Sequence, residues 1–274
     1  MFRKTLAAAT LALVFSATAQ AAPLSFKDKI LEAKSCAGKN SEGKPLCHQL
    51  TVGYPITGDK HLDDWVRKEM GGKLPTQKSV QTTLIRDKDV KETNKENQKL
   101  RKAGEYPCAL DYIDTLELEG YTPNYAVFGQ EDWEYNCGPH GYGVHTLTVL
   151  KRGIANPKPL KLNDILLPNQ EGKLTHLLEE AYVKYLKENS GDTEEEARDY
   201  ISGYNSDKFS ATENWRFDKN GLTFLYQSYE IGAYVLGRPE FTIPTKDLQG
   251  IVKPEILKEA EHFIQPKKII KEPV

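Results

Sequence analysis

Apolar residues recur at helical spacing in three parts of the chain. The clearest repeat runs over residues 172–189 and predicts one amphipathic helix, whose apolar stripe consists of Leu174, Leu177, Leu178, Ala181, Tyr182, Tyr185 and Leu186. A shorter stripe predicts a helix within residues 57–70, which Gly71 and Gly72 end. A last helix is expected over residues 254–263, because these residues begin with a proline and carry apolar positions at the same spacing.

Strand patterns dominate the middle of the chain. Residues 109–121, 124–135 and 144–151 are rich in aromatic and β-branched side chains and are separated by Gly, Pro and Asn, which is typical of successive strands. Because the connections are short, these three strands are expected to pair antiparallel. Residues 48–56 also alternate well enough for a strand. Residues 213–231 predict a hairpin, in which Asn220-Gly221 would form a type I′ turn.

Helices and strands are segregated along the chain, and this predicts the α+β class. We expect an antiparallel sheet with helices packed on it, in two closely associated subdomains. The predicted division is a signal peptide at 1–22, an N-terminal part at 23–105, a C-terminal α+β domain at 106–265 and a loose tail at 266–274. Within the N-terminal part, residues 25–36 form a short amphipathic stretch, and the very polar residues 87–104 predict a solvated helix or a mobile loop.

The first 22 residues have the three parts of a cleavable secretory signal. Arg3 and Lys4 supply the charged start, residues 6–15 form a short apolar stretch, and residues 19–21 offer small side chains for cleavage. The apolar stretch is shorter than the roughly 20 residues that span a bilayer, and no later stretch is apolar enough. We therefore expect export to the periplasm and no membrane insertion after cleavage.

The charge balance is mildly acidic. The full chain has 37 basic and 39 acidic residues and a formal net charge of −2. Loss of Arg3 and Lys4 with the signal would leave 35 basic residues and a net charge of −4. This argues against a nucleic-acid partner, because phosphate contacts need clustered Lys and Arg. It would favour a basic protein partner.

Four cysteines in an exported chain predict two disulfides. Three connectivities are possible, and the local one is favoured, which pairs Cys36 with Cys47 and Cys108 with Cys137. The sequence contains no G-x-S-x-G, H-E-x-x-H, P-loop, dinucleotide-binding or C-x-x-C motif. No cofactor is expected.

Residues 135–147, "YNCGPHGYGVHTL", combine Cys137, His140 and His145, which are residue types that ligate zinc. We favour a glycine-rich turn instead, fastened by a disulfide at Cys137, in which His140 bonds to local backbone groups. The disulfide would consume the cysteine, no fourth ligand is evident, and His145 falls inside a predicted strand. No metal site and no catalytic residue is therefore assigned here.

A second unusual stretch, residues 226–244, contains three tyrosines before Gly237-Arg238-Pro239. Core packing would explain any one tyrosine, but Tyr229, Tyr234 and Arg238 beside a turn are residue types that anchor interfaces. Glu230 among these aromatic residues could act as an acid with a raised pKa, although no second carboxylate is placed to work with it.

Four segments in order resemble the RsiV-like extracellular domain family. They are "VGYPITGDKHLDDWV" at 52–66, "YNCGPHGYG" at 135–143, "KPLKLNDILL" at 158–167 and "GLTFLYQSYEIGAYVLGRPEFTIPTKDLQGIVKP" at 221–254. The resemblance implies a two-part α+β module on the outer side of a membrane. In one relative this module is the sensor of an anti-sigma factor and binds lysozyme. In others it accompanies a peptidoglycan deacetylase domain, as in PdaC-type enzymes.

From the resemblance and the charge, the leading hypothesis is a periplasmic protein that binds a cell-envelope ligand, in its sharpest form a basic lysozyme that it inhibits. The alternatives are a peptidoglycan-active enzyme or a deacetylase accessory module that binds a peptidoglycan fragment through His140 or Glu230, and a structural envelope protein. The candidate binding residues are His140, Tyr142, Tyr229, Glu230, Tyr234 and Arg238.

Overall fold

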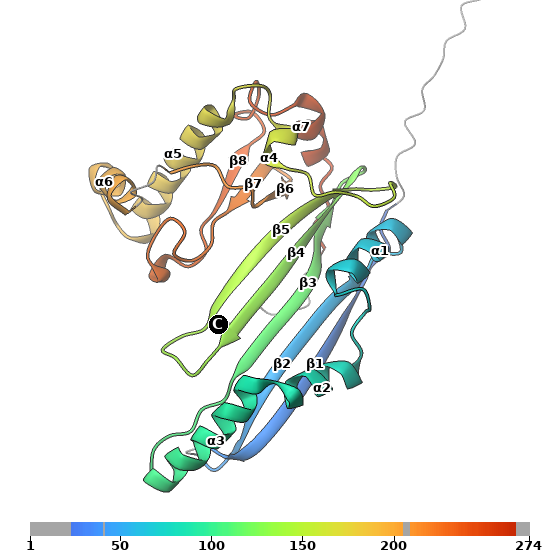
Figure 1. Ribbon diagram of the computed structural model, residues 1–274. Coiled ribbons are helices and arrows are strands. Elements are labelled where there is room, and N and C mark those ends of the chain that lie inside the picture. Colours follow the sequence, from blue (N-terminus) through green and yellow to red (C-terminus); the bar gives the residue numbers. More distant parts are fainter. Residues whose placement is uncertain (1–22, 41, 205–208, 267–274) are drawn as a thin grey trace, which may run out of the picture.

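The computed structural model describes residues 23–40, 42–204 and 209–266 and shows an α+β architecture with one large and one small sheet (Figure 1). This confirms the predicted fold class. The predicted signal peptide at 1–22 and almost all of the predicted tail lie outside the described residues. No helix in the described part of the chain is both long enough and apolar enough to cross a membrane. The proposed boundary between residues 105 and 106 stays a prediction.

Five strands form the large sheet in the order β1-β2-β3-β4-β5. They are β1 (Lys27–Lys39), β2 (Pro45–Ile56), β3 (Asp111–Tyr121), β4 (Tyr125–Tyr135) and β5 (Tyr142–Lys151). The three strands predicted in the middle of the chain pair antiparallel, as expected. However, β2 and β3 run parallel, because the chain between them makes a helical crossover, which is the connection that parallel neighbours require. Most of the amphipathic stretch at 25–36 belongs to β1, an edge strand.

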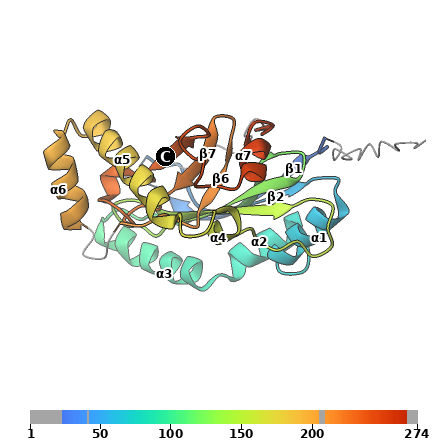
Figure 2. The ribbon, with the colours of Figure 1, turned by 90° about the horizontal axis from the view of Figure 1, so that it is seen from above.

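Three helices of the N-terminal half cover one face of this sheet (Figure 2). They are α1 (Lys60–Glu69), α2 (Gln77–Arg86) and α3 (Lys88–Ala103). Leu62, Val66, Val80 and Leu84 are buried against the aliphatic face of β2, β3 and β4. The polar segment 87–104 is thus a helix and not a loop.

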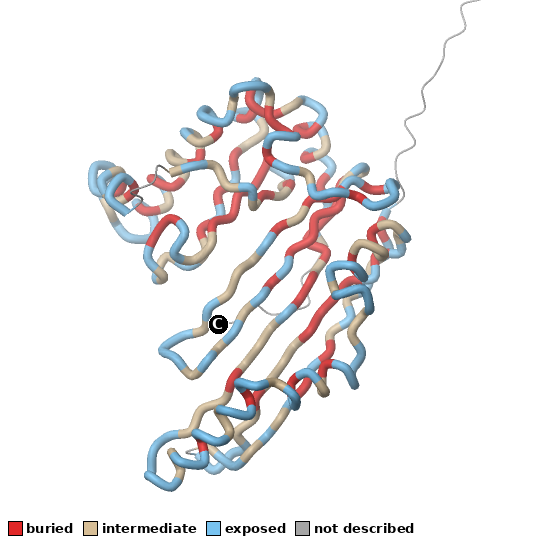
Figure 3. The backbone as a smooth tube through the Cα atoms, viewed as in Figure 1, coloured by how far each residue is buried: buried red, intermediate tan, exposed pale blue. Residues whose placement is uncertain are grey.

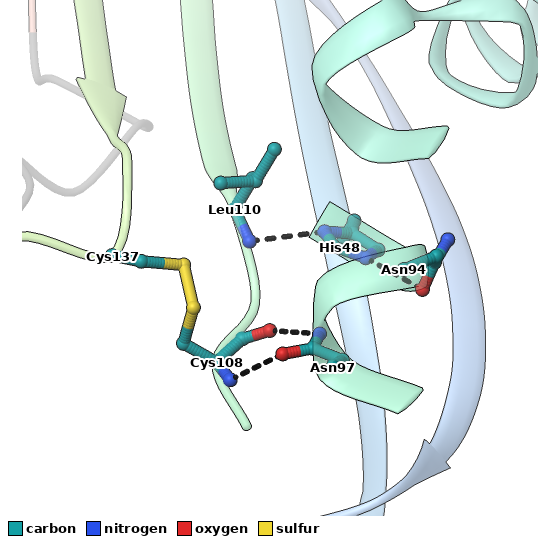
Figure 4. Close-up of a disulfide and its surroundings, with 6 residues drawn as sticks. All are labelled: His48, Asn94, Asn97, Cys108, Leu110 and Cys137. Carbon is teal, nitrogen blue, oxygen red and sulfur yellow. Dashed lines mark hydrogen bonds between the residues drawn. A yellow bond between two sulfur atoms is a disulfide. The ribbon is translucent and has the colours of Figure 1, made fainter. Parts of the chain in front are cut away.

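Polar side chains hold α3 to the sheet (Figure 4). Asn97 is 1% exposed. Its side-chain amide donates to the carbonyl oxygen of Cys108 at 2.7 Å and accepts the N–H of Cys108 at 3.0 Å. His48 accepts the N–H of Leu110 at Nδ1 and contacts Asn94 through Nε2 at 3.1 Å. These bonds satisfy buried backbone groups at the start of β3, and they explain how so polar a helix stays in place.

The C-terminal half packs on the opposite face of the large sheet, over β4 and β5 (Figure 2). It contains α4 (Leu162–Ile165), α5 (Glu171–Asn189), α6 (Glu194–Tyr204), β6 (Trp215–Asp218), β7 (Gly221–Leu225), the 3₁₀ turn η1 (Tyr234–Leu236), β8 (Glu240–Pro244) and α7 (Pro254–Ala260). Strands β6, β7 and β8 form the small antiparallel sheet. In α5, the stripe predicted from the sequence faces the core, with Leu174, Leu178, Tyr182 and Leu186 buried.

Burial follows these layers (Figure 3). One hydrophobic core lies between the large sheet and the N-terminal helices. The other joins Val127, Leu147 and Val149 of the large sheet to the aromatic residues of the small sheet and to α5. The ends of β4 and β5 near the connecting turn are mostly exposed or intermediate. This end of the sheet adjoins the candidate site.

The predicted type I′ turn at Asn220-Gly221 is wrong by one residue. Asp218 pairs with Gly221, so Lys219 and Asn220 are the two central residues of the turn. Neither Asn220 nor Gly221 has a positive φ. Gly221 is the first residue of β7, where an added Cβ would lie 2.0 Å from the carbonyl oxygen of Ile243. The glycine is therefore needed for close strand packing and not for the turn.

Side chains from the helices cover the exposed edge of β1. Gln77 donates to the carbonyl oxygen of Glu32 at 2.6 Å, and Gln81 donates to that of Lys34 at 3.0 Å. Four helical residues rise about 6.0 Å and two strand residues about 6.7 Å, so the two spacings match. The pairs occupy carbonyls that would otherwise be open to another strand.

Replacement of both Gln77 and Gln81 by alanine is expected to destabilise the fold by about 1–2 kcal/mol in total and to speed amide exchange in β1 more than in β4. Hydrogen exchange followed by mass spectrometry measures this. Replacement of the exposed Thr83 of α2 by alanine serves as the control. Equal exchange in β1 for the double variant and the wild type would contradict the edge-covering role.

Candidate functional site

A disulfide anchors the turn between β4 and β5 to the N-terminal half. Cys137 bonds to Cys108, and Cys36 bonds to Cys47, so the predicted local pairing is confirmed. Cys137 has a φ of +62°, a conformation that non-glycine residues seldom adopt. The disulfide links this turn to the residues just before β3, which Asn97 of α3 already holds (Figure 4). The turn is consequently tied to the N-terminal half.

Residues of the C-terminal half also contact the same turn. The ring of His140 stacks on Tyr234, with centroids 3.8 Å apart and planes inclined by 18°. The Tyr234 hydroxyl donates to the carbonyl oxygen of Gly141 at 2.9 Å, and Nδ1 of His140 lies 2.9 Å from the same oxygen. His140 thus bonds to local backbone, and Tyr234 joins residues that are far apart in the sequence.

A groove of about 830 Å³ opens where the two halves meet. Its walls come from the end of β4, the turn after it, the start of β5 and the segment around η1. They comprise Trp133, Tyr135, Pro139, His140, Gly141, Gly143, Ser228, Tyr234, Val235, Gly237 and Arg238. An added Cβ would come within 2.1 Å of the Trp133 ring at Gly141 and within 2.8 Å of it at Gly143. The glycines in this turn therefore make room for the indole.

Large apolar side chains remain exposed around the groove. We call Tyr204, Tyr229 and Val235 the exposed rim; their exposed fractions are 38%, 49% and 88%. Tyr142 is 45% exposed, but it pairs with Glu134 and so lies on the opposite face of the sheet from Trp133 and Gly143. Tyr229 lies against Tyr234, with ring centroids 5.5 Å apart, and the Tyr204 hydroxyl reaches the carbonyl oxygen of Tyr229 at 3.5 Å. Tyr229 has a φ of +68°. A bulky residue in this region is strained, which is common at functional sites.

A buried ionic cluster lies at the inner end of the groove. Nδ1 of His145 lies 2.9 Å from Oε2 of Glu131, and its Nε2 lies 3.5 Å from Oε1 of Glu119. Arg238 donates to the same Glu131 oxygen at 2.7 Å. An added Cβ at Gly129 would come within 2.7 Å of Glu119 and 2.8 Å of His145, so this glycine provides the space for the pair.

The cluster is electrically balanced when His145 is protonated. Burial alone would lower the pKa of His145, but its interactions with the carboxyl groups of Glu119 and Glu131 outweigh burial and raise the pKa to about 9. Burial alone would raise the pKa of Glu131, but the bonds from His145 and Arg238 prevail and lower it. Two carboxylates thus face one imidazolium and one guanidinium, and each buried charge has a partner.

Two side-chain amides cover the outer edge of β5. Gln227 bonds to both the N–H and the carbonyl of His145, at 3.0 Å and 2.8 Å. Asn214 receives the N–H of Leu147 at 2.6 Å and donates to the carbonyl of His145 at 2.8 Å. These amides take the place of a sixth strand and attach the C-terminal half to the large sheet.

The six residues proposed from the sequence have different positions. His140, Tyr234 and Arg238 line the groove together, and Tyr229 packs on Tyr234. Tyr142 is exposed on the opposite face of the large sheet. Glu230 is exposed, and its carboxylate accepts the N–H of Gln227 at 2.6 Å. Partial burial of the carboxyl group raises its pKa. No hydrogen bond joins Glu230 to His140 in the described part of the chain.

Sequence reasoning missed Trp133, Glu119 and Glu131. Each falls within a predicted strand, and Glu131 pairs directly with His145 across β4 and β5. A charged residue in an otherwise buried strand position was the available signal. Cys137, His140 and His145 do not converge on one point, because Cys137 is in a disulfide and His145 contacts the glutamates. Among the described residues, no group of three or more His, Cys, Asp or Glu side chains could hold a metal ion.

A family model described as "Protein of unknown function (DUF3298)" matches residues 163–246. A DUF3298 domain is therefore present, and it contains Tyr229, Tyr234 and Arg238 but not the turn with His140. No curated protein matches the chain.

Two solved structures have a similar fold. A member of the DUF3298 family from Bacteroides fragilis has a TM-score of 0.63 and 21% identity, with 87% of this chain and 97% of that chain covered. A DUF3298 family protein from Pseudomonas aeruginosa PAO1 has a TM-score of 0.59 and 20% identity, with 86% and 97% covered. At these identities the likeness shows the fold alone.

Proposed function

We propose that this protein is a periplasmic binding protein of the cell envelope, and that the exposed rim is the surface that receives a basic partner protein of the lysozyme type. One observation carries this proposal: three large apolar side chains, Tyr204, Tyr229 and Val235, are exposed beside one groove. Tyrosine and arginine are the residues that most often anchor protein interfaces. Val235, at 88% exposed, has no structural role that requires an apolar side chain.

The surroundings of the rim support a basic partner. Glu230 follows Tyr229 directly and is exposed. The whole chain has a formal net charge of −2. Opposite charges at the edge of an interface speed association, and salt weakens this effect. The sequence resemblance to the RsiV-like family supports the same partner.

Export is part of the proposal and has its own support. Two disulfides form in this structure, and disulfides persist in oxidising compartments such as the periplasm. The three parts of a secretory signal in residues 1–22 agree with export.

Calorimetric titration of a basic lysozyme into the oxidised protein should show association at micromolar concentration, weaker at moderate salt than at low salt. Lytic activity, followed in parallel, should fall as the complex forms. Val235→Asp should weaken binding by about tenfold or more, because it places a charge among the exposed apolar side chains of the rim. Ile85→Asp is the matched control, since Ile85 is 51% exposed on α2, and it should bind like the wild type. Salt-insensitive association, no association, or equal weakening by both variants would refute the proposal.

A further inference from the structure

The groove has the size and the lining of a small-molecule site. Its volume of about 830 Å³ lies within the roughly 300–1,000 Å³ of typical ligand clefts. It combines aromatic walls with a few polar groups. Three features of the groove together indicate the chemistry of the ligand: an open backbone position on β5, two aromatic walls and the guanidinium of Arg238.

The first feature is an open backbone position on the edge of β5. His145 and Leu147 point their N–H groups away from β4, toward Gln227 and Asn214. Because this orientation alternates along a strand, Gly143 also points its N–H and C=O away from β4. No hydrogen-bond partner for these two groups occurs in residues 23–40, 42–204 and 209–266. The next outward carbonyl, of Gly141, is bonded to Tyr234.

The open edge is therefore one residue long. Gln227 closes it at His145, and Tyr234 closes it at Gly141. An extended peptide that adds to a sheet needs several consecutive open positions, and this edge does not offer them. A single amide group, with one N–H and one C=O, would satisfy both groups of Gly143. Because Gly143 lines the groove, a ligand there can reach them.

The second feature is the pair of aromatic walls. Trp133 lies opposite Gly143 in the register of β4 and β5, and the stacked rings of His140 and Tyr234 form the wall at the turn. The electron-rich face of an aromatic ring attracts the weakly positive C–H groups of a flat apolar surface. The face of a pyranose ring is such a surface, and its hydroxyl groups can meet Ser228 at the edge of the groove.

The third feature is the guanidinium of Arg238. Glu131 holds it through one nitrogen at 2.7 Å, and Arg238 lines the groove. Within the described residues, Glu131 is its one charged partner. A guanidinium fixed in this way is suited to bind a carboxylate through its other nitrogens.

We infer that this groove binds an N-acylated amino sugar that carries a carboxylate. The acylamino group bonds to the backbone of Gly143, the sugar ring lies between the aromatic walls, and the carboxylate faces Arg238. This inference uses the groove of the proposed binding site but does not depend on the partner protein. The tests below contain no second protein, so their failure and the failure of lysozyme binding can be told apart.

Three sugars test the parts of the inference when each is titrated into the ¹⁵N-labelled protein. N-acetylmuramic acid has both the amide and the carboxylate, N-acetylglucosamine lacks the carboxylate, and glucosamine lacks the acyl group. We expect saturable binding of the first, about tenfold weaker binding of the second because a charge-assisted hydrogen bond is lost, and no binding of the third. The amide signal of Gly143 and the indole signal of Trp133 should shift.

Two variants separate the roles of the side chains. Arg238→Gln should reduce binding of N-acetylmuramic acid about tenfold and leave that of N-acetylglucosamine within about twofold. Ile85→Asp, on the far face of the sheet, should change neither. If Arg238→Gln fails to fold, the shifts of Gly143 in the wild type still decide. Absence of saturable N-acetylmuramic acid binding, unshifted Gly143, or equal binding of glucosamine would overturn the inference.

Discussion

Replacement of both Cys108 and Cys137 by alanine is expected to lower the free energy of unfolding by about 3–4 kcal/mol. The disulfide closes a loop with a sequence separation of 29 residues, and a cross-link of this length removes that much chain entropy from the unfolded state. The turn that carries His140 would also lose its anchor to the N-terminal half, so the stack of His140 on Tyr234 should loosen. Urea unfolding, followed by tryptophan fluorescence, measures the stability.

The second disulfide is the matched control for this prediction. Cys36 and Cys47 are separated by 11 residues, so their replacement by alanine should cost less, by about 1 kcal/mol. That variant should also keep the groove intact, because the pair lies on β1 and β2 at the other side of the sheet. Equal losses for the two double variants, or an unchanged His140 environment without Cys108 and Cys137, would contradict the anchoring role.

Stability is expected to fall as the pH rises from about 6.5 to about 9, and His145 is the cause. Folding raises the pKa of His145 from 6.5 to about 9, so the native state holds the proton more tightly than the unfolded state. The stabilising contribution is complete below the unfolded pKa and is lost as the pH passes through the folded pKa. A shift of this size corresponds to roughly 3 kcal/mol. Glu131 has the opposite sign: its pKa is lowered, so its contribution is lost in acid.

Urea unfolding at a series of pH values tests this dependence. His145→Gln should be less stable than the wild type near neutral pH and should show a much shallower decline between pH 6.5 and 9. His176→Gln, on the exposed side of α5, is the control and should keep the wild-type slope. A parallel decline in the wild type and in His145→Gln would show that another group titrates.

Elements with strong local periodicity could be predicted from the sequence. The stripe of α5, the helix α1 and the strands β3, β4 and β5 follow from patterns within about 20 residues. The pairing of the cysteines also followed, since the nearer partners were the simplest choice. By contrast, β1 has few apolar residues, because one of its faces is open and its edge is covered by Gln77 and Gln81.

The candidate site could be predicted only in part. Tyr229, Tyr234 and Arg238 could be predicted as binding residues, because tyrosine and arginine cluster beside a turn. His140 could be predicted because it lies among glycines. The sequence does not predict that Trp133 lines the groove, because a tryptophan in a strand usually belongs to the core. Glu230 was a candidate for its aromatic neighbours in the sequence, but its carboxylate bonds to the nearby backbone of Gln227.

The sequence by itself determined the fold class, the main helices and strands, and the two disulfides, because each depends on residue type and on short-range spacing. Tertiary structure alone decided the parallel pairing of β2 with β3, the ionic cluster of Glu119, Glu131, His145 and Arg238, and the groove. These features join residues more than 50 positions apart, or place charges in an interior where only partners from other elements make them stable. Local patterns contain no information about which distant segment will supply such a partner.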